Sequence, residues 1–525
     1  MFLFAQRAIL RLALVLGLFC CLLGTGTSPA VAAVKDKWAA RVQFQDVIVK
    51  AKDLAKRPYQ DSGQDLPDVL KKMGYDQWRG IRFKPARSLW LGQPFSVQFF
   101  HLGFLYQHPV TVHYIDQEGD HQFPFSSDLF QYPTKDLKGY LPQDYGFAGF
   151  RIHYPLNTPK YADELVAFLG ASYFRALGQG QLYGMSARGL SINTAEDTGE
   201  EFPVFREFWI PHPSSRAKRI KIYALLDSNS VTGAYEFIIE PGTETVMKVN
   251  SELFVRQHIQ KIGIAPLNSM FFYGKNTGPR PEGDFRPEVH DSDGLLINDR
   301  SGEWIWHPLV NPSQLLVNSF GGGQPTGFGL LQRDVDFDHY QDLEARYDLR
   351  PSVWVSPKGD WGRGHLELVQ IPTGDEYNDN IVAYWVPERP FERGDVVKYD
   401  YSLKWYSERN ERSPEGFVQA THIVKKADGE KMFMIEFAGD ELRSVSKDTR
   451  PQPDVWISKG AHLSDTQLIR NSVTGGWRLV LHVALDAPNP MELNLSHQKP
   501  AVEFRVSLKN KGKALTETWS YTFLP

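Results

Sequence analysis

The sequence predicts an all-β protein, with a large antiparallel β-sandwich domain followed by a smaller immunoglobulin-like β-sandwich domain. Aromatic residues make up 13% of the 525 residues, and aromatic side chains favour strands. Apolar and polar residues alternate in many short runs, as in Val110, Val112 and Tyr114, which is the period of a strand with one buried face. No regular alternation of strands with helices is visible, which argues against a parallel doubly wound sheet.

Residues 1–32 have the pattern of a cleaved secretory signal peptide. Arg7 and Arg11 form a basic segment, residues 12–23 form an apolar run, and Ala30-Val31-Ala32 offers small residues for cleavage. The apolar run is shorter than the roughly 20 residues that a transmembrane helix needs. We therefore expect export without stable membrane insertion, and an uncleaved anchor is the alternative.

Composition narrows the chemistry of the mature chain. Both cysteines, Cys20 and Cys21, lie in the leader, so a thiol nucleophile or thiolate metal site is not expected. Cleavage would leave 56 basic and 62 acidic residues, a net charge of −6 with histidine neutral. This balance argues against nucleic acid or an anionic membrane surface as the main partner, and it suits a neutral substrate. We expect no cofactor and no metal.

The predicted domains follow from composition and periodicity. Apolar residues between Phe44 and Ala55 have helical spacing, and residues 220–226 and 234–239 form a predicted hairpin around a polar turn. The large domain is expected to span residues 33–386. Prolines and charges at 387–395 indicate a linker, and the regular alternation over 396–525 indicates the immunoglobulin-like domain.

Two acidic loops, each followed by tryptophans, are the strongest candidates for a functional site. The first contains His290, Asp291 and Asp293, and the second contains Asp375, Glu376 and Asp379. Carboxyl groups can supply acid and base catalysis, and flat aromatic faces suit the C–H-rich faces of sugar rings. The simpler alternative for each loop is a solvated turn whose aspartates bond to the local backbone.

Three tryptophans and one arginine also have two interpretations each. Trp304 and Trp306 are two positions apart, so both would face the same side of a strand. Core packing is the alternative to sugar stacking for these residues and for Trp385. Arg188 is expected in a structural ion pair, with a role in a cleft as the second interpretation.

Beyond these features, the chain resembles the periplasmic glucan biosynthesis proteins, the family of glucans biosynthesis proteins G and D. The matching segments are ordered and cover essentially the whole mature chain. They include Gly146-Phe147-Ala148-Gly149-Phe150, Leu169 to Arg175, Ser186-Ala187-Arg188-Gly189-Leu190, His290-Asp291-Ser292, Gly302-Glu303-Trp304-Ile305-Trp306, Gly327 to Arg333, Tyr347-Asp348-Leu349-Arg350-Pro351 and Asn378 to Trp385.

The resemblance implies a periplasmic role in making osmoregulated glucans with a β-1,2-linked glucose backbone. Members look like anomer-inverting endo-β-1,2-glucanases, whose general acid falls on Asp379 and general base on Asp291. As an acid, Asp379 should hold its proton through burial or through neighbouring carboxylates such as Asp375 and Glu376. The residues expected to bind substrate are His290, Asp293, Trp304, Trp306, Arg188, Asp375, Glu376, Tyr377 and Trp385.

The sequence is therefore compatible with two functions. The first is an enzyme that cleaves or trims β-1,2-glucan. The alternative is a non-catalytic glucan-binding or assembly factor that works with the inner-membrane glucan glucosyltransferase. Incubation of the purified protein with linear β-1,2-glucan separates them, because an active enzyme releases short oligosaccharides.

Overall fold

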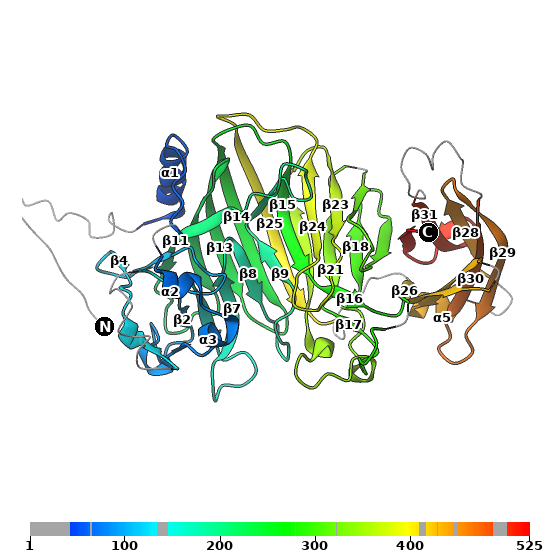
Figure 1. The fold of residues 1–525 in the computed structure, drawn as a ribbon, viewed down its shortest axis with the longest axis horizontal. Coiled ribbons are helices and arrows are strands. Elements are labelled where there is room, and N and C mark those ends of the chain that lie inside the picture. Colours follow the sequence, from blue (N-terminus) through cyan, green and yellow to red (C-terminus); the bar gives the residue numbers. More distant parts are fainter. Residues whose placement is uncertain are drawn as a thin grey trace, which may run out of the picture.

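The computed structural model confirms the all-β class (Figure 1). It describes residues 42–525 apart from 64–65, 134–144, 279, 322, 409–415, 428, 446–449 and 487–500. The signal peptide predicted for residues 1–32 lies outside the described residues. The short helical elements are α1 (Phe44–Leu54), α2 (Asp68–Lys71), α3 (Tyr75–Arg79), η2 (Pro85–Arg87), η3 (Ser127–Leu129), η4 (Phe337–His339), η5 (Tyr347–Leu349) and α5 (Asp440–Ser444).

One layer of the large domain is a ten-stranded sheet. Its strands follow the order β2, β6, β7, β8, β9, β15, β24, β23 and β20, and β10 pairs with β15. Neighbouring strands are antiparallel throughout. The strands are β2 (Ser96–Phe100), β6 (Gly149–Tyr154), β7 (Asp163–Leu169), β8 (Tyr173–Ala176), β9 (Ser186–Arg188), β10 (Leu190–Ile192), β15 (Ile262–Ser269), β20 (Leu316–Phe320), β23 (Gly364–Gln370) and β24 (Ile381–Pro387).

The other layer is a fifteen-stranded sheet in the order β28, β31, β33, β19, β18, β21, β22, β25, β14, β13, β12, β11, β3 and β4, with β32 on β31. The pairs β3–β11 and β19–β33 are parallel. The strands are β3 (Thr111–Ile115), β4 (Asp120–Gln122), β11 (Val204–Pro211), β12 (Ile220–Asp227), β13 (Val231–Glu240), β14 (Thr245–Val255), β18 (Gly294–Asn298), β19 (Trp304–Pro308), β21 (Gly327–Leu331), β22 (Ser352–Lys358), β25 (Val396–Tyr406), β28 (Gln452–Ile457), β31 (Val502–Asn510), β32 (Lys513–Ala514) and β33 (Thr518–Phe523).

The main core lies where these two sheets face each other. Phe150 of β6 meets Phe208 of β11 at a ring-centroid distance of 4.9 Å, and Phe168 of β7 meets Phe237 of β13 at 5.2 Å. Because alternate side chains of a strand point to the same face, one set of residues from each strand enters this core. The predicted hairpin is confirmed as β12 and β13, and α1 packs on the outer face of that hairpin.

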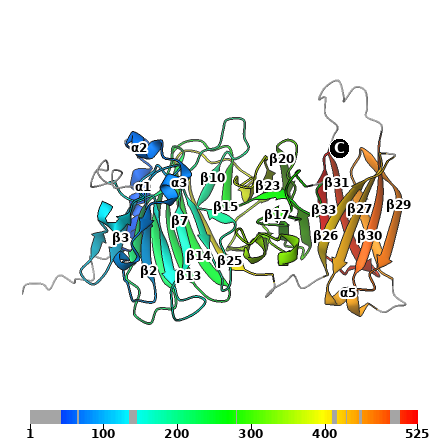
Figure 2. The same cartoon turned by 60° about the horizontal axis from the view of Figure 1, so that its bottom comes forward.

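A second core joins the C-terminal strands to the edge of the large domain. A four-stranded sheet in the order β26, β27, β30, β29 packs against β28, β31 and β33, as Figure 2 shows. Its strands are β26 (Phe417–Lys425), β27 (Lys431–Ala438), β29 (Ala461–Arg470) and β30 (Trp477–Leu485). Two facing antiparallel sheets of this kind form a small sandwich. The two sandwiches are connected through the parallel pair β19–β33.

The predicted start of the smaller domain at residue 396 is corrected by the pairing of β25. This strand, Val396–Tyr406, pairs with β14 over Phe254–Thr245 and with β22 over Ser352–Lys358. It therefore lies in the middle of the large sheet, and the C-terminal sandwich begins beyond it. Alternation of apolar and polar residues predicts that a segment is a strand, but it does not say which strands are its neighbours.

Both acidic loops leave this framework beside strand ends. The first follows β17 (Val289–His290), which pairs with β16 (Phe271–Tyr273), and the second connects β23 to β24.

A further two-stranded sheet joins β1 (Arg82–Phe83) to β5 (Phe130–Gln131). No helix in the described part of the chain is long and apolar enough to cross a membrane.

Candidate functional site

The loop that carries Asp379 is fixed at both ends by amide side chains. Asn380 is buried, and its side chain bonds the backbone of Phe271 through both the N–H and the carbonyl oxygen, at 2.8 and 3.0 Å. Asn311 bonds the backbone of Thr373 at the other end in the same two-way manner. Asp375 then accepts hydrogen bonds from the N–H of Tyr377 and from a further side chain of the loop. These contacts define where Asp379 is presented.

Glu376 ties this loop to the chain segment that precedes Asp291. Its carboxylate accepts hydrogen bonds from the Arg286 guanidinium at 2.6 Å and from the Tyr347 hydroxyl at 3.0 Å. Arg286 also donates to Asp284 and Asp342, so one guanidinium connects three carboxylates. Charge-assisted hydrogen bonds of this kind are about twice as strong as neutral ones. We call this group, Asp284, Arg286, Asp342 and Glu376, the Arg286 clamp.

Asp291 is buried and held by an arginine. It is 5% exposed, and Arg350 donates a hydrogen bond to its Oδ1 atom. Arg350 in turn packs on the Tyr347 ring at 4.3 Å. A Cβ atom at Gly184 would lie 2.9 Å from the Arg350 Cβ, so a glycine is needed there to make room for this arginine. The position of Arg350 therefore depends on its contacts with Asp291 and Tyr347 and on the space left by Gly184.

The electrostatics of Asp291 link it to the second acidic loop. Burial raises the pKa of Asp291, and the negative charge of Asp379 raises it further, whereas Arg350 and Arg175 act in the opposite direction. A raised pKa makes a carboxylate a stronger base once it is ionised. The two acidic loops are therefore linked through the action of the Asp379 charge on Asp291.

Asp379 opens onto a groove of ≈ 610 Å³ beside the ten-stranded sheet. Charged groups on the groove walls are Glu164, Arg175 and Asp379, and the remaining walls are mainly aromatic. Burial raises the pKa values of Tyr106 and Tyr173, with a smaller contribution from Asp379, so their hydroxyls remain donors at neutral pH. The aromatic and apolar lining consists of Phe100, Leu105, Tyr106, Tyr173, Phe174, Tyr183 and Tyr377, with Leu169 at the end of β7. Such a wall offers both ring faces and hydroxyl groups to a sugar.

The predicted burial of Asp379 is wrong. Its side chain is 31% exposed, and the Arg175 guanidinium lies beside it, with Nη2 at 3.9 Å from Oδ2. Asp375 and Glu376, which were expected to keep it protonated, bond to other groups of the loop and of the Arg286 clamp. The reason is local: Asp379 belongs to the loop between β23 and β24, and burial begins only at the next residue, Asn380.

His290 and Asp293 belong to a separate charged cluster. His290 is completely buried, stacks on Phe271, and bonds Gln332 at 3.0 Å and Glu288 at 3.2 Å. Although burial opposes it, the carboxylates of Asp293 and Glu288 raise the pKa of His290 to about 9. Asp293 accepts a backbone hydrogen bond from Asp334 at 2.8 Å. His290 and Asp293 therefore both bond to other groups of the protein, on either side of Asp291 in the chain.

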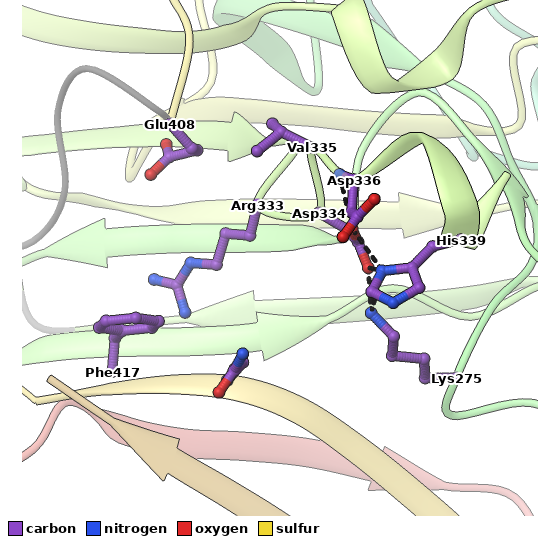
Figure 3. A pocket seen from close by; sticks show the side chains of 9 residues that line it. Lys275, Arg333, Asp334, Val335, Asp336, His339, Glu408 and Phe417 are labelled. Carbon is purple, nitrogen blue, oxygen red and sulfur yellow. Dashed lines mark hydrogen bonds and ion pairs between the residues drawn. The ribbon is translucent and has the colours of Figure 1, made fainter. Parts of the chain in front are cut away.

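The pocket beside this cluster, drawn in Figure 3, contains acidic and histidine side chains of the kinds that bind metal ions. Glu288, Asp334 and His339 offer ligand atoms within 4.8 Å of one another, as do Glu288, His290 and Asp293. Figure 3 shows Lys275 and His339 converging on Asp334, and the Lys275 ammonium also lies 3.2 Å from Glu288. This ammonium already supplies the positive charge that a cation would bring. The donor set therefore fits an internal ion-pair cluster better than a metal site.

The tryptophans predicted to stack on sugars lie away from the Asp379 groove. Trp304 is tilted against Trp354 at 5.7 Å, and Trp306 is buried under the Arg333 guanidinium at 3.6 Å, both in the core shared with the C-terminal strands. Trp385 is fully buried in the main core. The alternative of core packing thus describes Trp306 and Trp385, whereas Trp304 is half-buried and also lines a hollow of ≈ 690 Å³ beside the C-terminal strands.

Arg188 is also internal. It is 2% exposed and donates to Asn268 at 2.8 Å and to Glu200 at 2.6 Å. Its guanidinium lies over the ring of Tyr173, which lines the groove, at 5.2 Å. The expectation of a structural ion pair describes these contacts, and the contact with Tyr173 is its connection to the groove.

Four residues of this region had no role in the sequence-based prediction. Arg175, Tyr106 and Tyr173 line the groove, and Arg350 holds Asp291. Tyr173, Arg175 and Arg350 stand in segments that match the family resemblance, Leu169 to Arg175 and Tyr347 to Pro351. That match was the one signal available for them, because arginines and tyrosines in strands and turns carry no periodicity that marks a site.

Comparison with known proteins gives one strong relationship. The sequence model of the family described as periplasmic glucan biosynthesis protein, MdoG, matches residues 42–523. Glucans biosynthesis protein G of Ralstonia nicotianae is 45% identical over 494 residues, covering 92% of this chain and 96% of the relative.

Two solved structures show only weak similarity to this chain. Slr1438 protein of Synechocystis is 9% identical with a TM-score of 0.18, covering 59% of this chain and all of that one. A glycoside hydrolase family 32 structure from Bifidobacterium adolescentis is 10% identical with a TM-score of 0.10, covering 82% and 74%. Scores this low support no argument about fold or activity. The family model, by contrast, matches nearly the whole described chain. This protein therefore belongs to the periplasmic glucan biosynthesis (MdoG) family and, as predicted, is a periplasmic protein of glucan synthesis.

Proposed function

We propose that this protein cleaves or trims β-1,2-linked glucan during the synthesis of osmoregulated periplasmic glucans, as an anomer-inverting endo-glucanase. The single observation that best supports this is the pairing of an accessible carboxyl group with a buried one. Asp379 opens onto a groove with aromatic walls, whereas Asp291 is buried and accepts a hydrogen bond from Arg350. Glycosidases use two carboxyl groups with different surroundings in this way.

Asp379 is proposed as the general acid. It needs a proton when the leaving oxygen departs, and its carboxyl group is 31% exposed in the absence of substrate. A sugar chain that fills the groove would displace water from Asp379 and from the aromatic walls around it. Exclusion of water would bring the Asp379 carboxyl group into direct contact with the glycosidic oxygen, as proton transfer requires.

Asp291 is proposed as the general base. Inversion requires this carboxylate to remove a proton from the attacking water, on the side of the sugar ring opposite the acid. Burial makes Asp291 more basic, while its hydrogen bond from Arg350 keeps the ionised form accessible near neutral pH. The other oxygen of the carboxylate then remains to accept the proton, directly or through water.

The second candidate function is a non-catalytic glucan-binding or assembly factor that works with the membrane glucosyltransferase. One observation favours it: each proposed catalytic carboxyl group has an arginine beside it, Arg175 at Asp379 and Arg350 at Asp291. A guanidinium stabilises a carboxylate and opposes its protonation. In this case the groove would hold glucan without cleaving it.

Incubation of the purified protein with linear β-1,2-glucan tests the proposal. Wild type is expected to release short oligosaccharides. Asp379→Asn keeps the size and polarity of the side chain but has no proton to donate, so turnover should fall by about 10²–10⁴ while glucan still binds. Glucan binding by both proteins with no products from either would support the second candidate function.

A further inference from the structure

The connection between β11 and β12 carries an unpaired basic segment. Arg216, Lys218 and Arg219 are exposed, and within the described part of the chain none of them has a hydrogen bond, an ion pair or a ring contact. The next basic residue, Lys221, is different because it forms an ion pair with Glu236 at 2.8 Å. Three cations within four consecutive residues, none with an ion-pair partner in the described part of the chain, form a local positive surface on a chain whose net charge is −4.

This basic segment borders a shallow hollow of ≈ 940 Å³. Lys218, Arg219 and Lys221 lie along it, together with His212 and with Glu240, whose carboxylate pairs with Lys248. Pro211, Pro213 and Pro241 also contribute to its walls, and prolines restrict the backbone on both sides. The charges are therefore presented on one face by strand ends and a short, restrained connection.

An exposed apolar turn lies next to the same face. The Trp90 ring meets the His212 ring edge-on at 5.1 Å, which places this tryptophan beside the hollow. Leu91 follows it and is 62% exposed. The Gln93 N–H bonds the Trp90 carbonyl oxygen at 3.0 Å and closes a turn, in which the Trp90 side chain is half-buried against the main core and the Leu91 side chain is exposed. An exposed leucine has no role in the core, and here it stands beside unpaired cations.

We propose that this face, formed by Trp90, Leu91, Arg216, Lys218 and Arg219, docks reversibly on an anionic phospholipid surface. Each Lys or Arg close to such a surface strengthens binding by roughly fivefold, and tryptophan and leucine side chains enter the headgroup region. The combination of cations with an apolar tip distinguishes a lipid surface from a small anion such as phosphate, which would use the charges alone. Docking of this kind is peripheral, and it would hold a periplasmic protein close to the membrane.

Sedimentation with lipid vesicles tests the proposal. The purified full-length mature protein is mixed with vesicles of phosphatidylglycerol and phosphatidylcholine, and separately with pure phosphatidylcholine vesicles, at low and at physiological ionic strength. We expect binding to the anionic vesicles that weakens as salt increases, because salt screens exposed charges over about 10 Å at 0.1 M. Reversal of the three cations, Arg216→Glu, Lys218→Glu and Arg219→Glu together, should weaken binding by about 100-fold or more.

A matched variant controls for overall charge. Lys459→Glu, Lys511→Glu and Lys513→Glu change the net charge equally at exposed positions of the C-terminal sandwich, and this variant should bind vesicles within about threefold of wild type. Leu91→Ser should weaken vesicle binding but leave any binding of inorganic phosphate unchanged. Equal loss in both triple variants, binding to phosphate alone, or no binding to anionic vesicles would each overturn the proposal. Glucan cleavage is measured separately and does not enter this test.

Discussion

Asp291 and Asp379 are held in opposite ways by the two loops that carry them. Asp291 follows a strand, is 5% exposed and accepts a hydrogen bond from Arg350. Asp379 lies near the end of the loop between β23 and β24, is 31% exposed at its side chain and has Arg175 at 3.9 Å. The difference suits the proposed roles, because a base can stay fixed in the protein whereas an acid has to reach the leaving oxygen of a bound chain.

The largest effect is expected from removal of either carboxyl group. Asp379→Asn and Asp291→Asn should each lower turnover of linear β-1,2-glucan by about 10²–10⁴, since each lacks one proton transfer. The double variant should be hardly worse than the slower single variant, because the two groups act in one step. Oligosaccharide release measured under saturating substrate provides the comparison. Normal cleavage by Asp379→Asn would move the search for the acid to Asp375, Glu376 or Asp293.

The next effect concerns Arg350, the partner of the buried carboxylate. Arg350→Met should cost about 3–5 kcal/mol at neutral pH, the usual effect of leaving a buried charge unpaired. The pKa of Asp291 is already raised by burial, and loss of the arginine would raise it further. The folded state then binds a proton that the unfolded state has released, so stability should fall as pH rises through this raised pKa and recover below about pH 4.

Urea unfolding of wild type and Arg350→Met at pH 4 and pH 7 measures this dependence. A second change, Asp291→Asn, removes the charge and should restore most of the stability that Arg350→Met loses at pH 7. A deficit that stays the same at both pH values, without rescue, would assign the effect to packing on Tyr347 and not to the charge of Asp291.

A smaller effect is expected from the Arg286 clamp. Arg286→Met frees Glu376 and with it the loop that presents Asp379, so turnover should fall by about 10–10²-fold, as for a misplaced catalytic group. Arg363→Met is a suitable control, because Arg363 pairs with Glu388 in an ion pair that is largely exposed. The control should leave turnover within about twofold of wild type. Equal losses in both variants would contradict a positioning role.

The smallest effect is expected from the tryptophans outside the groove. Trp304 packs against Trp354 beside the C-terminal strands. Trp304→Phe should therefore leave glucan affinity unchanged within about twofold, while it lowers stability by roughly 1–3 kcal/mol through the smaller contact area. Calorimetric titration with β-1,2-glucan oligosaccharides measures the affinity. A loss of affinity above tenfold would restore Trp304 as a sugar-binding residue.

The sequence predicted what depends on local patterns. Alternation identified strands such as β12 and β13, and the two acidic loops were found as a pair. Pairing between distant strands was less accessible: β25 has the alternation expected of the C-terminal domain but pairs with β14 and β22. A strand's partners are decided by contacts across the fold, which the strand's own sequence does not contain.

The site was only partly predictable for the same reason. Asp291 and Asp379 were identified by resemblance, but the arginines beside them come from β8 and from the turn before β22. The predicted stacking tryptophans follow from residue type alone, and two of them, Trp306 and Trp385, are core residues while Trp304 is half-buried beside the C-terminal strands. The tyrosines of the groove were missed because tyrosine is common in strands and nothing local marks Tyr106 or Tyr173 as exposed to a groove.

The most direct test of the account is the configuration of the first product. Proton NMR of linear β-1,2-glucan, recorded within minutes of adding wild-type protein, reports the anomeric proton of each new reducing end before it equilibrates. With Asp379 as acid and Asp291 as base, water attacks opposite the leaving oxygen, and the account predicts that the α-anomer appears first. Initial release of the β-anomer would contradict it.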